Sequence, residues 1–302
     1  MILVIGGTGD LGGRVVRLLR EQGEEVRALV RQGSDASELR SAGVEVVAGD
    51  LTDPASLARA CDGASIVIAT ATSMGRILAG QKSLSMREVD EDGMAALVSA
   101  AEAAGAERFI YVSFAGADQG VGSPLEHAKL ATERRLRAAK IQATVLRPDA
   151  FQEIHLAPIG RFDIAAGKVS TFGRGDTERR YVSTQDVAAL IAKVVREADA
   201  PEVIEFGGPE SMSRNGAVRV AERITGRPIK VRRLPLPIAG FLMRRMSRRN
   251  PALASVFGAG LAQDKVPASW DDMPLRERGI VPRSVSDYLT EQASALAVNS
   301  VD

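Results

Sequence analysis

Short apolar runs alternate with amphipathic stretches through the first half of the chain. An apolar run without polar interruption is typical of a strand that is buried on both faces. Apolar positions spaced by three and four residues indicate helices between these runs. We predict strands at Ile2–Ile5, Val26–Val30, Val44–Val47, Ser65–Ala69, Arg108–Val112 and Ala143–Leu146. The predicted helices are Leu11–Glu21, Pro54–Ala60, Met86–Ala104 and Leu125–Ala139.

This alternation predicts an α/β protein with a doubly wound parallel sheet of the Rossmann type. After about residue 150 the pattern changes, since strand-like stretches shorten and nine of the 13 prolines lie between Pro201 and Pro282. We expect a Rossmann domain over residues 1–150 and a smaller C-terminal lobe over 151–302, intertwined with the first. In the second half we predict strands at Val169–Phe172, Tyr181–Val182, Val203–Phe206 and Ile229–Arg233. The corresponding helices are Thr184–Arg196, Arg214–Thr225 and Ser284–Ala295.

Composition narrows the class of protein. Of the 302 residues, 45% are hydrophobic and 25% are charged, an ordinary globular mixture. With a net charge of +1, the composition does not indicate nucleic-acid binding, which needs a clustered basic face, so we expect no nucleic-acid partner. Cys61 is the only cysteine, which fits a reducing cytoplasm, and no His/Cys spacing predicts a metal site. Neither a basic leader nor an apolar run of roughly 18 residues is present, so we expect a cytoplasmic protein without a membrane partner.

Three glycines with two residues between each pair join the first predicted strand to the first predicted helix. A helix begins with N–H groups that lack intrahelical partners and with partial positive charge, which suits a phosphate. Gly6 allows a tight turn, Gly9 leaves room for a pyrophosphate, and Gly12 lets the helix approach the sheet. This position predicts a dinucleotide site rather than a turn without a ligand. Its predicted members are Gly6, Thr8, Gly9, Asp10, Leu11 and Gly12.

The end of the second strand distinguishes the two pyridine dinucleotides. An acidic side chain there holds the ribose 2′-hydroxyl of NAD, whereas an arginine accommodates the 2′-phosphate of NADP. Arg31 stands at this end without a neighbouring carboxylate, so NADP(H) is favoured over NAD(H), the alternative being a solvated arginine. Residues after the third and fourth strands are expected to line the same cofactor: Asp50 and Leu51, then Ala69, Thr70 and Ala71.

Five stretches together resemble a known family. They are Ile5-Gly6-Gly7-Thr8-Gly9-Asp10-Leu11-Gly12, Gly49-Asp50-Leu51, Arg108-Phe109-Ile110-Tyr111-Val112-Ser113, Leu146-Arg147-Pro148 and Tyr181-Val182-Ser183-Thr184-Gln185-Asp186-Val187-Ala188. Over roughly residues 1–225 the chain resembles the NmrA-like branch of the atypical and extended short-chain dehydrogenases. The resemblance implies a bound dinucleotide, a substrate cleft between the lobes and a small-molecule substrate. That family includes reductases of quinones, imines, dyes and phenylpropanoids, and also proteins that only sense the cofactor.

The resemblance also implies a catalytic tyrosine with a lysine four residues later on the same helix face. Lys129 matches the lysine, which would hold the nicotinamide ribose, but Leu125 stands where the tyrosine belongs. His127 is an alternative donor, although two residues of helix turn it about 200° away from Lys129. Ser113 occupies the place of the family's catalytic serine, unless it only closes the fifth strand.

The segment after Arg147 is implied to pass the nicotinamide. Pro148 and Phe151 would flank the ring. His155 is a candidate general acid because histidine ordinarily titrates near neutrality; a purely structural histidine is the alternative.

These residues predict an NADP(H)-dependent reductase that transfers hydride to a hydrophobic quinone, enone, imine or similar molecule. Two alternatives remain, a non-catalytic NADP(H)-sensing regulator or assembly factor, and a redox-neutral isomerase or cyclase. The stretch Leu234–Met243, followed by Arg244–Arg249, fits either a roof over an apolar pocket, which we favour, or a contact with a membrane surface. The polar stretch Ser73–Ser85 is a candidate lid or a surface loop. The sequence specifies no oligomeric state.

Overall fold

The computed structural model describes residues 1–78 and 85–299, and the chain forms two compact units. The first contains residues 1–113, 124–147 and 187–204. The second contains residues 114–123 and 148–186 and the described part of 205–302. The chain re-enters the second unit at residue 148 and returns to the first unit over residues 187–204.

A seven-stranded sheet organises the first unit. Its order is β10-β6-β5-β4-β1-β2-β3, and every neighbouring pair from β6 to β3 is parallel. Switching from β1 to β4 in the middle of this order confirms the predicted doubly wound sheet. The strands are β1 (Ile2–Ile5), β2 (Val26–Val30), β3 (Glu45–Ala48), β4 (Ile66–Ala69), β5 (Arg108–Val112), β6 (Gln142–Pro148) and β10 (Val203–Phe206).

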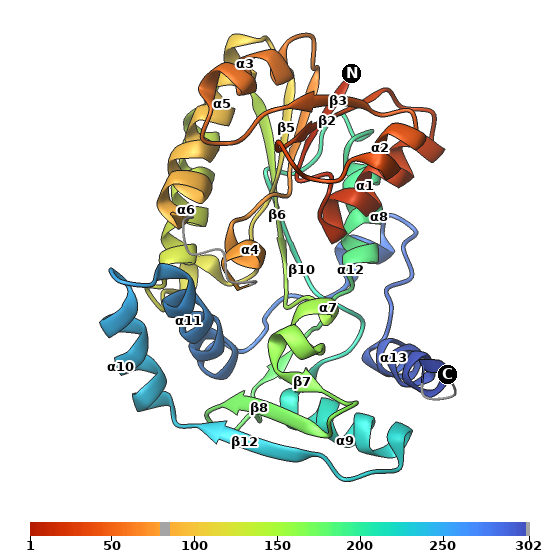
Figure 1. Ribbon diagram of the computed structural model, residues 1–302, viewed down its shortest axis with the longest axis vertical. Coiled ribbons are helices and arrows are strands. Elements are labelled where there is room, and N and C mark those ends of the chain that lie inside the picture. The colour runs from red at the N-terminus through yellow and green to blue at the C-terminus, as the bar shows by residue number, and fades with distance from the viewer. Residues whose placement is uncertain (79–84, 300–302) are drawn as a thin grey trace. The chain divides into compact units, whose positions relative to one another are not determined.

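Helices cover both faces of this sheet, so its central strands can be apolar throughout. In Figure 1, α3, α5 and α6 lie along one face and α1 and α8 along the other. Leu57, Val67, Leu97 and Phe109 are fully buried in the core between the sheet and the first group. The helices are α1 (Asp10–Glu21), α2 (Ser37–Ser41), α3 (Pro54–Cys61), α4 (Met74–Leu78), α5 (Met94–Ala103), α6 (Pro124–Ala138) and α8 (Thr184–Val194).

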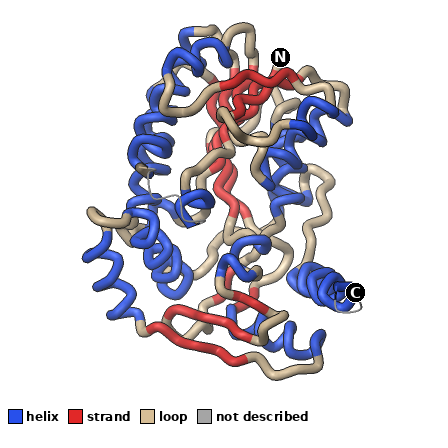
Figure 2. The backbone as a smooth tube through the Cα atoms, in the orientation of Figure 1, coloured by secondary structure: helices blue, strands red, loops and turns tan. Residues whose placement is uncertain are grey.

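The second unit is built from smaller pieces, as its short strands in Figure 2 show. One mixed sheet has the order β12-β8-β7, and a short antiparallel pair joins β11 to β9. The strands are β7 (Phe162–Asp163), β8 (Lys168–Phe172), β9 (Glu178–Arg179), β11 (Met212–Ser213) and β12 (Lys230–Leu234). The helices are α7 (Gln152–His155), α9 (Arg214–Thr225), α10 (Leu236–Met246), α11 (Pro251–Lys265), α12 (Met273–Arg276) and α13 (Val285–Asn299).

Three predicted elements differ from the structure. Tyr181–Val182 is not a strand, because Val182 makes only a single bridge to Phe151. The predicted helix at 86–104 begins as a π-helix over Arg87–Gly93 before it continues as α5. The candidate lid contains α4, whereas residues 79–84 lie outside the described residues. Among the described residues, no helix combines the length and the hydropathy that crossing a bilayer requires.

Candidate functional site

The glycine turn between β1 and α1 is closed so tightly that side chains cannot enter it. Gly6 has φ +98°, and a Cβ there would lie 2.7 Å from Thr70 Oγ1. A Cβ on Gly12 would lie 2.1 Å from Gly6 O. The first turn of α1 therefore rests directly on the backbone that leaves β1, as the sequence spacing requires.

The N-terminus of α1 remains accessible beyond this turn. Gly9 is the N-cap residue and supplies no side chain to accept from the first N–H groups of the helix. Thr8, Gly9 and Asp10 are exposed, and the Asp10 carboxylate is held by Arg14 at 2.9 Å. Uncapped donors, helix polarity and a cradle that a Cβ would fill together fit a pyrophosphate.

Two arginines approach one another near the carboxyl ends of β2 and β4. Arg31 follows β2 and is half-buried, and Arg76 lies on α4. Burial lowers the pKa of Arg76, and the positive charge of Arg31 lowers it further, while Asp50 opposes the shift. Like charges this close raise the local positive potential, which suits a phosphate dianion. Sequence analysis placed Arg76 only within the candidate lid Ser73–Ser85, because nothing in its local pattern predicts an interaction with Arg31.

The residues after β3 and β4 hold the turn in place. Asp50 Oδ1 accepts from Thr52 N at 2.9 Å and from Thr52 Oγ1 at 2.7 Å, so its carboxylate stabilises its own loop. Leu51 and Ala69 are buried. Thr70 donates to Ile5 O from both N and Oγ1, and the backbone N of Ala71 lies beside Gly6. The expected cofactor contacts of Asp50 and Leu51 stay predictions.

Lys129 and Ser113 meet at the carboxyl end of β5. Lys129 Nζ donates to Val112 O at 2.8 Å and lies 4.8 Å from the centre of the Tyr111 ring. Ser113 follows Val112 directly and is 5% exposed, and its Oγ has no hydrogen-bond partner among the described residues. A buried hydroxyl without a partner costs free energy, so this oxygen is available to a ligand.

The helix that carries Lys129 is anchored by a buried ion pair. Glu133 lies one turn further along α6 and accepts from Arg147 of β6 at 2.6 Å. Leu125 lies one turn earlier, at the position expected for the family's tyrosine, so no phenol is present there. His127 is exposed whereas Lys129 is buried, so His127 lies on a different face of α6 and does not replace the tyrosine.

Pro148, Phe151 and His155 belong to the second unit. Pro148 O accepts from Ala115 N at 2.9 Å, and Phe151 O accepts from His155 N at 2.8 Å. Gln263 Nε2 pairs with His155 Nδ1, and the amide of Gln263 and the imidazole therefore share one hydrogen bond. Burial, followed by the positive charges of Arg214 and Arg179, lowers the pKa of His155 to about 3. The imidazole is therefore neutral at pH 7, which argues against the predicted role as general acid.

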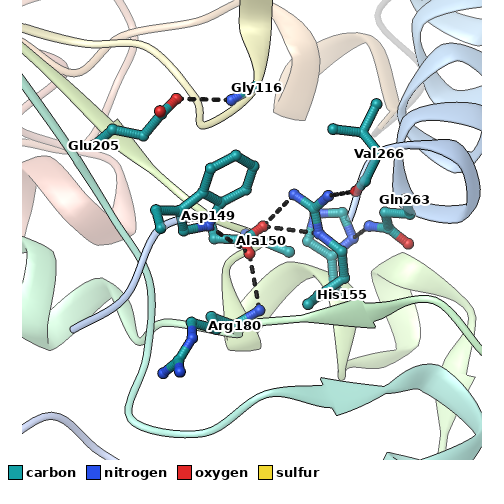
Figure 3. Close-up of polar contacts among 10 residues, drawn as sticks. Gly116, Asp149, Ala150, His155, Arg180, Glu205, Gln263 and Val266 are labelled. Atoms are coloured by element: carbon teal, nitrogen blue, oxygen red, sulfur yellow. Dashed lines mark hydrogen bonds and ion pairs between the residues drawn. The ribbon is translucent and has the colours of Figure 1, made fainter. Parts of the chain in front are cut away.

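Beside His155, a buried carboxylate accepts hydrogen bonds from four residues, the next residue Ala150 and the distant Arg179, Arg180 and Trp270, and sequence analysis missed it. Figure 3 shows Asp149 at the centre of this network. Its carboxylate accepts hydrogen bonds from Arg179 Nε at 3.0 Å and from Arg180 N at 2.8 Å. Trp270 Nε1 donates to Asp149 Oδ2 at 2.9 Å. No local pattern marks Asp149, because three of its four partner residues lie 30, 31 and 121 residues away.

A small polar pocket adjoins this network within the second unit, with Tyr181, Arg214, Gln263 and Asp264 in its wall. Arg214 donates to the backbone oxygens of Ser170, His155 and Gly160, which fixes its guanidinium. Burial raises the pKa of Tyr181, so its phenol stays protonated at neutral pH. Within residues 1–78 and 85–299, no three His, Cys, Asp or Glu side chains gather as metal ligands.

A parallel doubly wound sheet with a glycine turn at the first helix defines an NAD(P)-binding Rossmann protein with the atypical short-chain dehydrogenase fold. The family model described as NAD(P)H-binding matches residues 6–198. The chain belongs to this NAD(P)H-binding family, as the resemblance predicted.

Relatives in this family have different activities. A photosystem II assembly factor, Ycf39 of Trieres chinensis, is 30% identical over 251 residues, which cover 82% of this chain and 75% of that protein. The ceramide reductase of Caulobacter vibrioides is 32% identical over 281 residues, covering 89% and 85% respectively. The solved Escherichia coli quinone oxidoreductase in complex with NADPH is 22% identical, with a TM-score of 0.76 over 98% of this chain and 100% of that one. The last likeness shows the fold, and the chain is thus related both to reductases and to assembly factors.

Proposed function

We propose that this protein is an NADP(H)-dependent reductase that passes hydride to a hydrophobic quinone, enone, imine or similar carbonyl-like acceptor. The observation that carries the proposal is the buried Ser113 hydroxyl, which has no partner among the described residues and follows the residue that binds Lys129. The reductase names of two relatives support the same class of reaction.

Each part of the first unit has a role in this proposal. The N–H groups of α1 and the glycine turn bind the pyrophosphate, and Lys129 holds the nicotinamide ribose. When bound, NADPH supplies the hydride. Ser113 donates a hydrogen bond to the acceptor atom and stabilises the charge that develops there. Because the side chain of Leu125 cannot donate a proton, a water molecule that Ser113 orients delivers the proton.

The test of turnover is single-turnover oxidation of NADPH with a panel of quinones, imines and enones. We expect Lys129→Ala to lower the rate about 100-fold or more, since it removes the fixed charge beside Val112. Lys140→Ala is the matched control, because Lys140 is exposed and lies just beyond α6. Equal rates in the two variants, or no oxidation with any acceptor, would contradict the reductase.

The preference for NADP(H) rests on the pair of Arg31 and Arg76. We expect alanine at either position to weaken NADPH binding about 10- to 100-fold, because a charged hydrogen bond to phosphate contributes roughly 1.5–3 kcal/mol. NADH binding should change little. Calorimetry with both nucleotides measures this, and Arg40→Ala, at an exposed position on α2, is the control. A parallel loss for NADH would show that neither arginine reads the 2′-phosphate.

A second candidate is an NADP(H)-binding assembly factor without turnover. Leu125 in place of the family's tyrosine favours it, as does the likeness to the photosystem II assembly factor Ycf39. Tight NADPH binding in calorimetry, combined with no oxidation by the whole acceptor panel, would favour this candidate over the reductase.

A further inference from the structure

Positive charge is segregated into one part of the second unit. Residues 223–263 contain nine arginines and lysines and no aspartate or glutamate, although the whole chain has a net charge of only +1. The remainder of the chain therefore carries a net charge of −8. All nine cationic residues are exposed, and seven of them lie on β12 or on and just after α10: Lys230, Arg232, Arg233, Arg244, Arg245, Arg248 and Arg249.

Helix α10 has two different faces. Ala239 and Met243 are buried and pack with Ala254 and Leu261 of α11. Ile238 and Phe241 point away from this cluster and are 48% and 59% exposed. Their spacing of three residues places them on one side of the helix.

The exposed side chains continue this face with arginines. Arg245 lies one turn beyond Phe241, and Arg244, Arg248 and Arg249 lie beside or just after it. None of these four arginines forms an ion pair with a carboxylate in the described ranges. The helix dipole favours cations at a helix end, but it does not account for two large apolar side chains in water beside them.

We propose that this face of α10, formed by Ile238, Phe241 and the four arginines, binds the surface of an anionic lipid bilayer. Ile238 and Phe241 enter the boundary between headgroups and acyl chains, and the arginines contact lipid phosphates. The buried face of α10 packs on α11 through Ala239 and Met243, and the expected roof over an apolar pocket stays a prediction. The expectation of no membrane partner does not account for the opposite face.

Two observations favour a bilayer over other occupants. Eight of the nine cations in residues 223–263 are arginines, whose planar guanidinium groups bind phosphate oxygens in pairs. A second copy of the same face would be repelled, because the face holds no carboxylate to balance its cations. An acidic protein would balance the charge, but apolar side chains that project beside arginines match a headgroup layer underlain by hydrocarbon.

The test is flotation of the full chain with phosphatidylcholine vesicles that contain about 30% phosphatidylglycerol, compared with pure phosphatidylcholine. We expect binding only to the anionic vesicles and its loss when the salt concentration rises from about 0.05 to about 0.5 M. The double variant Arg244→Gln, Arg245→Gln should weaken binding about 25-fold, or about fivefold for each arginine. Arg134→Gln, Arg137→Gln on exposed positions of α6 changes the net charge equally and should have little effect.

Phe241→Trp reports insertion, because its fluorescence should shift to shorter wavelength when anionic vesicles are added. Four results would overturn the proposal. They are absence of vesicle binding, equal binding to pure phosphatidylcholine, an equal loss in the control pair, and an unshifted tryptophan in vesicle-bound protein. Binding to polyglutamate without binding to vesicles would assign the face to an acidic protein instead, and self-association abolished by Phe241→Ser would assign it to a second copy.

Discussion

Replacing Ser113 by alanine tests whether its hydroxyl binds a ligand or stabilises the fold. The Oγ atom is buried, with the residue 5% exposed, and has no partner among the described residues. Burying such a group costs about 1–3 kcal/mol. Because Ser113→Ala removes the group and leaves only a small void, the free energy of unfolding should stay the same or rise by about 1 kcal/mol.

Ser56→Ala is the matched control, since Ser56 is another buried serine of the same unit. Its Oγ donates to Asp53 O at 2.8 Å and accepts from Asp50 N at 3.1 Å, and the residue is 0% exposed. Its removal takes away the acceptor of the part-buried Asp50 N–H, so we expect a loss of about 1–2 kcal/mol. Urea unfolding of both variants measures the difference.

The second readout is single-turnover oxidation of NADPH. We expect Ser113→Ala to slow it about 10- to 100-fold, because a preorganised donor at the developing charge is lost, while NADPH affinity stays near that of the native protein. Destabilisation equal to that of Ser56→Ala would refute the reasoning, since it would reveal a structural partner. So would native turnover in a fully stable variant.

Three other predictions follow from the packing and the charges. Gly12→Ala places a Cβ 2.1 Å from a backbone oxygen and should lower the free energy of unfolding in urea by roughly 1–3 kcal/mol. Gly13→Ala, whose Cβ would have its nearest neighbour at 3.4 Å, should raise it by up to about 1 kcal/mol. Equal effects of the two substitutions would contradict this prediction. The pKa of His155 is about 3 in the folded state against an ordinary 6.5, so the folded state binds fewer protons. The stabilising contribution of neutral His155 is fully present above pH 6.5 and decreases as the pH falls toward 3, by up to about 1.4 kcal/mol per pH unit. His155→Gln should therefore flatten this part of the pH profile of the free energy of unfolding measured with urea. An unchanged slope would refute this prediction. Burial raises the pKa of Cys61 to about 11, so a thiol reagent should modify it only in denaturant, and rapid labelling of the native protein would contradict its burial.

The first unit was largely predictable because its signals are local. Strands such as Ile2–Ile5 and Arg108–Val112 are buried on both faces, so each is a continuous apolar run in the sequence. Two elements were predicted incorrectly, because local signals do not decide their conformation. The pair Tyr181–Val182 is apolar enough for a strand, but only Val182 finds a bridge partner. The segment Arg87–Gly93, directly before α5, adopts π-helical geometry that no periodicity signals.

For this protein the sequence alone determined the class of sheet, the glycine turn and the absence of the family's tyrosine, because each depends on residues that are neighbours along the chain. Tertiary structure alone decided that Arg76 approaches Arg31, that Asp149 collects donors from distant segments, and that His155 is neutral. It also decided which side of α10 is exposed. The physical reason is that burial and the field of nearby charges depend on which segments meet in space, and those distances are not encoded in any local pattern.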